Sequence, residues 1–104
     1  MSMYRARDRV ENEAWLADLD DAADALDLDD AARERATDLF LSTVPDGERS
    51  KPAALAASLY AGGLIAGDRR SQRAVADAVG VSRLTIQGRW RPLLDEAGLD
   101  PPSW

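Results

Sequence analysis

A short basic segment holds the side chains of this chain that are best suited to contact another molecule. Residues 67–91 contain six arginines and two aspartates, a net charge of +4, whereas the whole chain has a net charge of −6. Arginine can bind guanine through two hydrogen bonds, and glutamine can bind adenine in the same way. The segment therefore predicts recognition of base edges in DNA, and the predicted base contacts are Arg83, Leu84, Gln87 and Arg91.

A second set of side chains is expected to bind DNA phosphates and so to fix the register of the protein on the duplex. It comprises Arg69, Arg70, Ser71, Arg73 and Ser82. Catalysis is not expected, because the chain has no cysteine and no histidine, which removes most nucleophile–base pairs and most transition-metal sites. Composition alone leaves a carboxylate-only hydrolase or a magnesium site open, but no paired-carboxylate motif is present. We predict a protein that is not an enzyme and has no cofactor and no metal.

These side chains must be positioned by a helix, a tight turn and a second helix, at about residues 71–94. Ser71 and Ser82 are suitable N-caps for the two helices, and Gly80 suits the turn because a left-handed backbone conformation is cheap for glycine. Ala76 is small enough for a close helix crossing, and Ile86 can fill the corner. A purely structural helical hairpin is the alternative, since such hairpins also occur in proteins that never touch DNA.

The rest of the chain predicts an all-α protein of one domain, residues 1–104, with five helices. Helix-favouring residues dominate and strand patterns are nearly absent. The first helix is expected from about Arg5 to Leu26, and the second from Asp29 or Asp30 to about Val44. The third follows Ser50 as its cap and is apolar nearly all round, which is typical of a central helix wrapped by others.

Two further expectations concern the last predicted helix and the tail that follows it. Pro92 lies inside the predicted last helix, where proline removes a backbone hydrogen bond, so we expect a kink near residues 88–92 or a break into two short helices. The tail from Gly98 to Trp104 is expected to be irregular, with Trp104 folding back on the core.

The charged residues of the chain are unusual in their types and in their distribution along the sequence. Twelve of its 13 basic residues are arginine and 14 of its 19 acids are aspartate, and net charge runs from −9 over residues 1–48 to +3 over residues 49–104. Surfaces poor in lysine and rich in aspartate are typical of proteins from salt-loving archaea. The alternative is an acidic patch that binds a basic partner. No signal peptide or membrane span is recognisable, so we expect a cytoplasmic protein that makes no contact with a membrane.

Residues 71–94, SQRAVADAVGVSRLTIQGRWRPLL, resemble the last two helices of a cyclin-like repeat in archaeal transcription factor B, the relative of eukaryotic transcription factor IIB. Repeats of that family commonly show the pattern TQ-x-x-(V/I)-A-x-x-x-G-V-(S/T)-x-x-T-(I/V)-x-x-R-(Y/W). The matching residues here are Gln72, Val75, Ala76, Gly80, Val81, Ser82, Thr85, Ile86, Arg89 and Trp90. The resemblance is strong over residues 50–94 and weak over residues 1–45, and together they cover one five-helix repeat.

This resemblance implies a role in transcription. Members of the family carry a zinc ribbon that recruits RNA polymerase and two repeats that hold the TATA-binding protein on promoter DNA. The ribbon needs cysteines, which this chain lacks, and no second repeat is recognisable in the sequence, so we expect a single-repeat relative. The implied function is a DNA-binding regulator or accessory initiation factor that reads promoter DNA, with TATA-binding protein or RNA polymerase as further partners. The alternative is an adaptor of the cyclin fold that binds TATA-binding protein or RNA polymerase without reading DNA.

Overall fold

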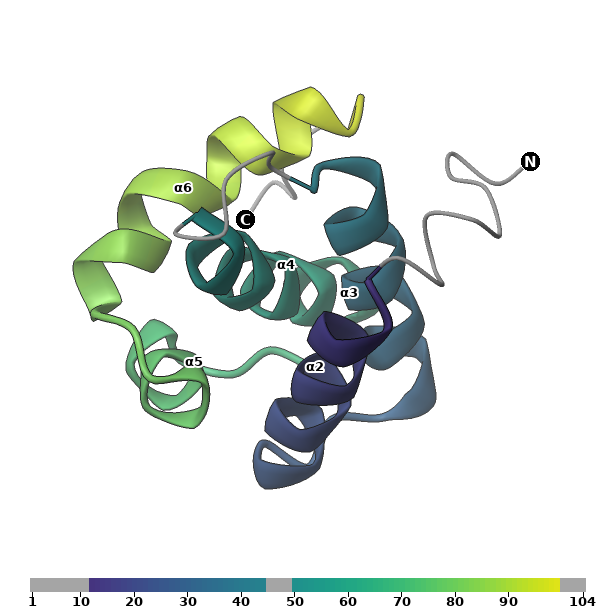
Figure 1. Ribbon diagram of the computed structural model, residues 1–104, viewed down its shortest axis with the longest axis vertical. Coiled ribbons are helices and arrows are strands. Elements are labelled where there is room, and N and C mark those ends of the chain that lie inside the picture. Colours follow the sequence, from purple (N-terminus) through teal and green to yellow (C-terminus); the bar gives the residue numbers. More distant parts are fainter. Residues whose placement is uncertain (1–11, 45–49, 100–104) are drawn as a thin grey trace.

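The computed structural model describes residues 12–44 and 50–99, and in these ranges it contains five α-helices and no β-strand (Figure 1). The all-α, five-helix prediction is confirmed. The helices are α2 (Glu13–Ala25), α3 (Asp30–Ser42), α4 (Lys51–Ala66), α5 (Gln72–Val79) and α6 (Arg83–Glu96).

Helix α4 forms the centre of the molecule. All of its residues from 54 to 64 are buried, and it packs against each of the other four helices, which surround it in Figure 1. Small residues allow this arrangement. A Cβ atom on Gly62 would lie only 2.7 Å from the backbone nitrogen of Ala36, so α3 and α4 meet backbone to backbone. On the other side of α4, the rings of Tyr60 and Trp90 pack edge to face, with centroids 5.5 Å apart.

The predicted helix ends are largely confirmed. Gly67 and Gly80 end α4 and α5 with positive φ angles of 77° and 90°, a conformation that favours glycine. Three predicted caps accept a backbone hydrogen bond from the third residue beyond them, and they are Asp29, Ser71 and Ser82. Ser50 stands at the start of α4 but makes no side-chain cap bond. Its backbone already has helical angles, whereas a capping serine is normally extended.

One predicted boundary is wrong within the described residues, and so is one of the two alternatives predicted at Pro92. The first helix does not run unbroken into Glu13, because Asn12 has φ −111° and ψ 20° and marks the start of α2. The upstream part of that prediction, residues 5–11, lies outside the described residues. Pro92 does not break the last helix, since α6 runs through it; the alternative expectation, a kink near residues 88–92, stays a prediction. Gly88, the residue whose carbonyl Pro92 cannot pair with, is exposed, so water can hydrate that carbonyl group. The expected fold-back of Trp104 also lies outside the described residues.

A polar network, which we call the Asp68–Arg70 clamp, joins the loop after α4 to the turn between α2 and α3. The Arg70 guanidinium donates to the carbonyl oxygens of Leu26 and Asp27, at 2.8 and 2.9 Å, and to the Asp68 carboxylate at 2.7 Å. The same carboxylate accepts a hydrogen bond of 2.8 Å from the backbone N–H of Asp29. That N–H, and then Arg70, lower the pKa of Asp68 below its ordinary value. The clamp ties the residues just before α5 to the turn between α2 and α3.

Candidate nucleic-acid interface

The corner between α5 and α6 is held by apolar packing and by the turn. Val75 and Ala76 from α5 and Ile86 from α6 are buried. The backbone N–H groups of Gly80 and Val81 both donate to the carbonyl oxygen of Ala76, at 2.8 and 3.1 Å. The turn and the apolar packing therefore fix the orientation of α6 relative to α5. This agrees with the requirements for a small residue at 76 and a glycine at 80.

The four predicted base contacts lie on one exposed side of α6, which we call the base-contact face (Arg83, Leu84, Gln87 and Arg91). All four are exposed, and their spacing places them on neighbouring turns of one helix face. Leu84 is 69% exposed although it is a large apolar residue. The Arg91 guanidinium lies 5.0 Å from the centroid of the Trp90 ring, a cation–π contact that holds it close to the helix.

The residues predicted to bind phosphate divide into three kinds. Arg69 and Arg73 are exposed, and among the described residues neither forms an ion pair. Ser71 and Ser82 lie at the N-termini of α5 and α6, where each hydroxyl oxygen caps its own helix at 3.0 and 3.1 Å. Arg70 is different, because the clamp occupies its guanidinium on the side of α2. The structure gives Arg70 a role in the fold, and we leave it out of the proposed interface.

Sequence reasoning did not identify one polar contact at this corner. The side-chain amide nitrogen of Gln72, the first residue of α5, donates a hydrogen bond of 2.7 Å to Oε1 of Gln87 on the base-contact face. Gln72 had matched the family pattern, but no role followed from that match. The spacing of 15 residues is not a helical repeat, so only the crossing of the two helices could reveal the contact.

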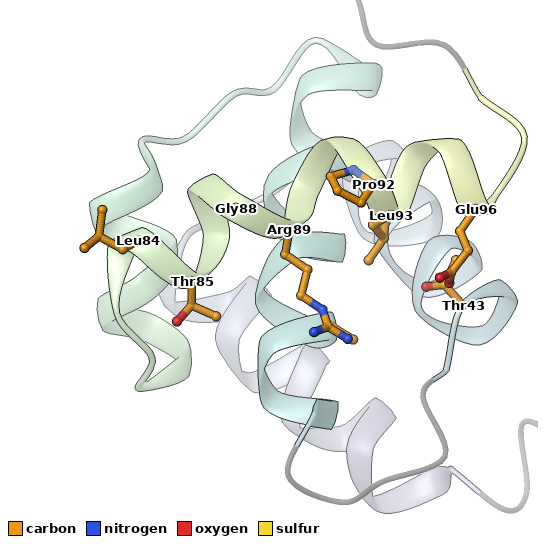
Figure 2. Close-up of a pocket in the computed structure, with 9 residues that line it drawn as sticks. Thr43, Leu84, Thr85, Gly88, Arg89, Pro92, Leu93 and Glu96 are labelled. Carbon is orange, nitrogen blue, oxygen red and sulfur yellow. The ribbon is translucent and has the colours of Figure 1, made fainter.

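Beside the base-contact face, α6 borders a groove of about 520 Å³ (Figure 2). Seven of its lining residues come from α6, and Thr43 and Ala54 close the other side. In Figure 2, Leu84 projects at one end of the groove, and Glu96 and Thr43 lie at the other. Arg89 is half-buried here, whereas Trp90 turns into the core with 7% exposure. The apolar contact with the core is therefore made by position 90 and not by position 89.

Comparison with known proteins identifies the family. The family model described as the transcription factor TFIIB repeat matches residues 13–96, which begin with α2 and end with α6. The chain belongs to the TFIIB-repeat family. It is 35% identical over 83 residues to transcription initiation factor IIB of Pyrococcus abyssi and to transcription initiation factor IIB 1 of Thermococcus kodakarensis. A shorter match of 45 residues, 44% identical, links it to transcription initiation factor IIB 1 of Thermoplasma volcanium.

The match corresponds to one repeat. The 83 residues are 77% of this chain but 28% of the Pyrococcus and Thermococcus proteins, and the Thermoplasma match spans 43% of this chain and 14% of that protein. The chain therefore shares with these initiation factors the TFIIB repeat itself. Within residues 12–44 and 50–99, no helix is long and apolar enough to cross a membrane. The same residues include no cluster of three or more acidic, cysteine or histidine side chains suited to a metal ion.

Proposed function

We propose that this TFIIB-repeat protein binds promoter DNA, with α6 in the major groove, and acts as a transcription regulator or accessory initiation factor. One observation carries the proposal: two arginines, a glutamine and an exposed leucine lie together on one side of α6. Arginine and glutamine can hydrogen-bond base edges, and an apolar side chain can contact the methyl group of thymine. Arg69, Arg73, Ser71 and Ser82 supply the phosphate contacts that orient the helix.

The acidic character of the chain does not oppose this function, because DNA meets a single face. Residues 12–44 hold ten acids and two bases, a net charge of −8, and residues 50–99 hold four acids and seven bases, a net charge of +3. At high salt, the release of counterions contributes less to affinity. Base contacts and close packing must then carry a larger share of the binding.

The groove beside α6 supports a second candidate function, that of an adaptor. Its apolar residues include Leu84, Pro92 and Leu93, and Arg89 supplies a positive charge inside it. Such a groove suits a protein segment that carries an acidic residue next to apolar ones. TATA-binding protein and RNA polymerase are the partners we would test for this role, in which the base-contact face would not meet DNA.

The test is selection of sequences from a pool of promoter fragments in high potassium chloride, with and without TATA-binding protein. The intact protein is compared with an Arg83→Ala/Gln87→Ala variant. Loss of either base contact should cost about 1–3 kcal/mol for a cognate site and relax the preference at one position. Arg35→Ala is the matched control, because Arg35 is an exposed arginine on α3, away from the proposed interface.

The outcomes separate the two candidate functions. Selective retention that survives Arg35→Ala and is lost in the double variant supports DNA recognition. If no sequence is retained in either condition, the DNA-binding proposal fails. Capture of TATA-binding protein or RNA polymerase in that case, weakened by Arg89→Ala, would favour the adaptor.

A further inference from the structure

A second groove, of about 360 Å³, lies where α2, α4 and α5 meet, and we call it the α2–α5 groove. Two aspartates of α2, Asp18 and Asp21, line it together with apolar residues of all three helices, among them Trp15, Pro52 and Val79. Helix α2 packs against both α4 and α5 (Figure 1). None of the described lining residues comes from α6, so this groove is separate from the base-contact face and from the groove in Figure 2.

The apolar part of the α2–α5 groove is only partly covered by the protein itself. Leu55 is buried, whereas Trp15, Pro52 and Val79 are half-buried, so part of their apolar surface faces solvent. The Trp15 ring already attracts a cation, because Nζ of Lys51 lies 6.0 Å from its centroid, within the distance of a cation–π contact. The volume is at the lower end of the range for ligand pockets and suits a few side chains of a partner.

The charge of the groove is negative. Asp18 and Asp21 are exposed, and their spacing places them on the side of α2 that carries Trp15. Within the described residues, neither carboxylate forms a hydrogen bond or an ion pair, with Lys51 or with any other residue. The last two residues of α5 also line the groove, and their carbonyl oxygens accept no hydrogen bond from the described chain. These carbonyl groups form the negative end of the helix dipole, so the groove offers acceptors to a positively charged donor.

We propose that the α2–α5 groove binds a segment of a partner protein in which an arginine stands next to an apolar residue. A guanidinium group is planar, carries five donors and stacks on aromatic rings, so it can donate to the Asp18 and Asp21 carboxylates while it packs against Trp15. The apolar neighbour then covers Pro52 and Val79. A nucleic acid does not suit this groove, because its phosphates would meet two carboxylates.

This inference is independent of DNA binding, because the groove uses no residue of the base-contact face. It places a site for a basic partner on the acidic part of the chain. The same molecule could then hold DNA through α6 and a partner protein through α2, α4 and α5.

The test is selection from a library of random peptides displayed on phage. The intact protein is used in the lowest concentration of potassium chloride at which circular dichroism shows it folded, because salt screens exposed charges. Selected peptides are synthesised, and their affinities are measured by calorimetry. We expect the selected sequences to share an arginine beside an apolar residue. Their affinity should fall about tenfold or more for Asp18→Asn/Asp21→Asn, since hydrogen bonds to charged groups are worth at least that factor.

Two controls separate a specific site from general attraction to an acidic protein. Glu34→Gln/Asp38→Asn also removes two exposed carboxylates, but from α3 and outside the groove. It changes the net charge by the same amount and should alter the affinity by less than about twofold, as expected for screened surface charges. Replacing the arginine of the peptide by citrulline, which has nearly the same shape without the charge, should reproduce the loss seen with Asp18→Asn/Asp21→Asn.

NMR shows where the peptide binds and whether each variant is folded. With a selected peptide, the indole N–H of Trp15 and the backbone amides of Ala78 and Val79 should shift, whereas the amides of α6 from Arg83 to Arg91 should not. The proposal is overturned if no arginine-containing sequence is selected, if the two double variants lose affinity equally, or if the peptide shifts α6 instead.

Two other occupants of the groove would also overturn the proposal. Residues 1–11 contain three arginines, Arg5, Arg7 and Arg9. If Arg5→Gln/Arg7→Gln/Arg9→Gln tightens peptide binding about tenfold, these residues of the same chain fill the groove. If the protein forms a dimer in sedimentation that Asp18→Asn/Asp21→Asn abolishes, the occupant is a second copy. None of these outcomes bears on the DNA-binding proposal, which is tested separately with promoter fragments.

Discussion

Two polar regions of this small protein use the same residue types in opposite ways. In the Asp68–Arg70 clamp, the arginine, the carboxylate and the backbone groups of the α2–α3 turn are all hydrogen-bonded to one another. On the base-contact face and beside it, Arg83 and Arg73 are exposed, and within the described part of the chain they form no ion pair. An arginine whose guanidinium is hydrogen-bonded within the protein stabilises the fold. An arginine that forms no ion pair within the described residues can bind a ligand.

The largest expected effect comes from the core beneath the base-contact face. Trp90→Ala removes an aromatic ring that packs on Tyr60 and should lower the free energy of unfolding by about 3–5 kcal/mol. That loss is a large part of the stability of a domain of this size, so DNA binding should disappear together with the fold. Chemical denaturation followed by circular dichroism measures it. A fully folded Trp90→Ala protein of unchanged stability would contradict the packing described here.

Arg70→Ala and Arg73→Ala compare the two regions most sharply, because they remove the same side chain three positions apart. Arg70→Ala should lower the free energy of unfolding by about 2 kcal/mol, since it breaks several charge-assisted hydrogen bonds. Arg73→Ala should change stability by no more than about 0.5 kcal/mol. It should instead weaken DNA binding for all sequences and reduce the salt dependence of log K by about 1.

Denaturant melts and salt titrations of the two variants give these quantities. The comparison fails if Arg73→Ala is the destabilising variant, or if Arg70→Ala leaves stability unchanged and reduces the salt dependence.

The smallest expected effect is a dependence of stability on pH at the clamp. The pKa of Asp68 is lowered in the folded protein by the Asp29 N–H and by Arg70, so its carboxylate stabilises the fold above the ordinary pKa of 3.8. That stabilisation is lost as the pH falls through the lower, folded-state pKa. Asp68→Asn should therefore narrow the difference in melting temperature between pH 6 and pH 3. An equal acid-induced decrease in both proteins would show that Asp68 does not contribute.

The sequence predicted most of the fold for reasons of local physics. Ser71, Gly80 and Ser82 mark helix ends through their own backbone and hydroxyl chemistry, and the apolar run around residues 54–64 predicts a central helix. The start of α2 was harder to place, because Asn12 differs little from its neighbours in hydrophobicity. Pro92 was misjudged as a possible break, since a proline in the helix interior usually disrupts it but an exposed residue stands at position 88.

The sequence predicted which side of the last helix carries the candidate site, but it did not predict the contacts that Arg70 and Gln72 make. The spacing of Arg83, Gln87 and Arg91 identifies one side of a helix without any tertiary information. Arg70 contacts Leu26, which is 44 positions away in the sequence, and Gln72 contacts Gln87, which is 15 positions away. Such pairings arise from how the helices cross, and no periodicity within a single helix encodes them.

Whether α6 is the DNA-binding helix is tested most directly by an NMR titration of the ¹⁵N-labelled protein with a duplex selected from promoter DNA, in high potassium chloride. We expect the changes in amide chemical shift to concentrate on α6 from Arg83 to Arg91 and on the N-terminus of α5, and the side-chain amide signal of Gln87 to shift as well. The amide chemical shifts of α2 should remain unchanged. Chemical-shift changes concentrated on α2 and α3, or no changes even at a large excess of DNA, would contradict the assignment of α6 as the DNA-binding helix.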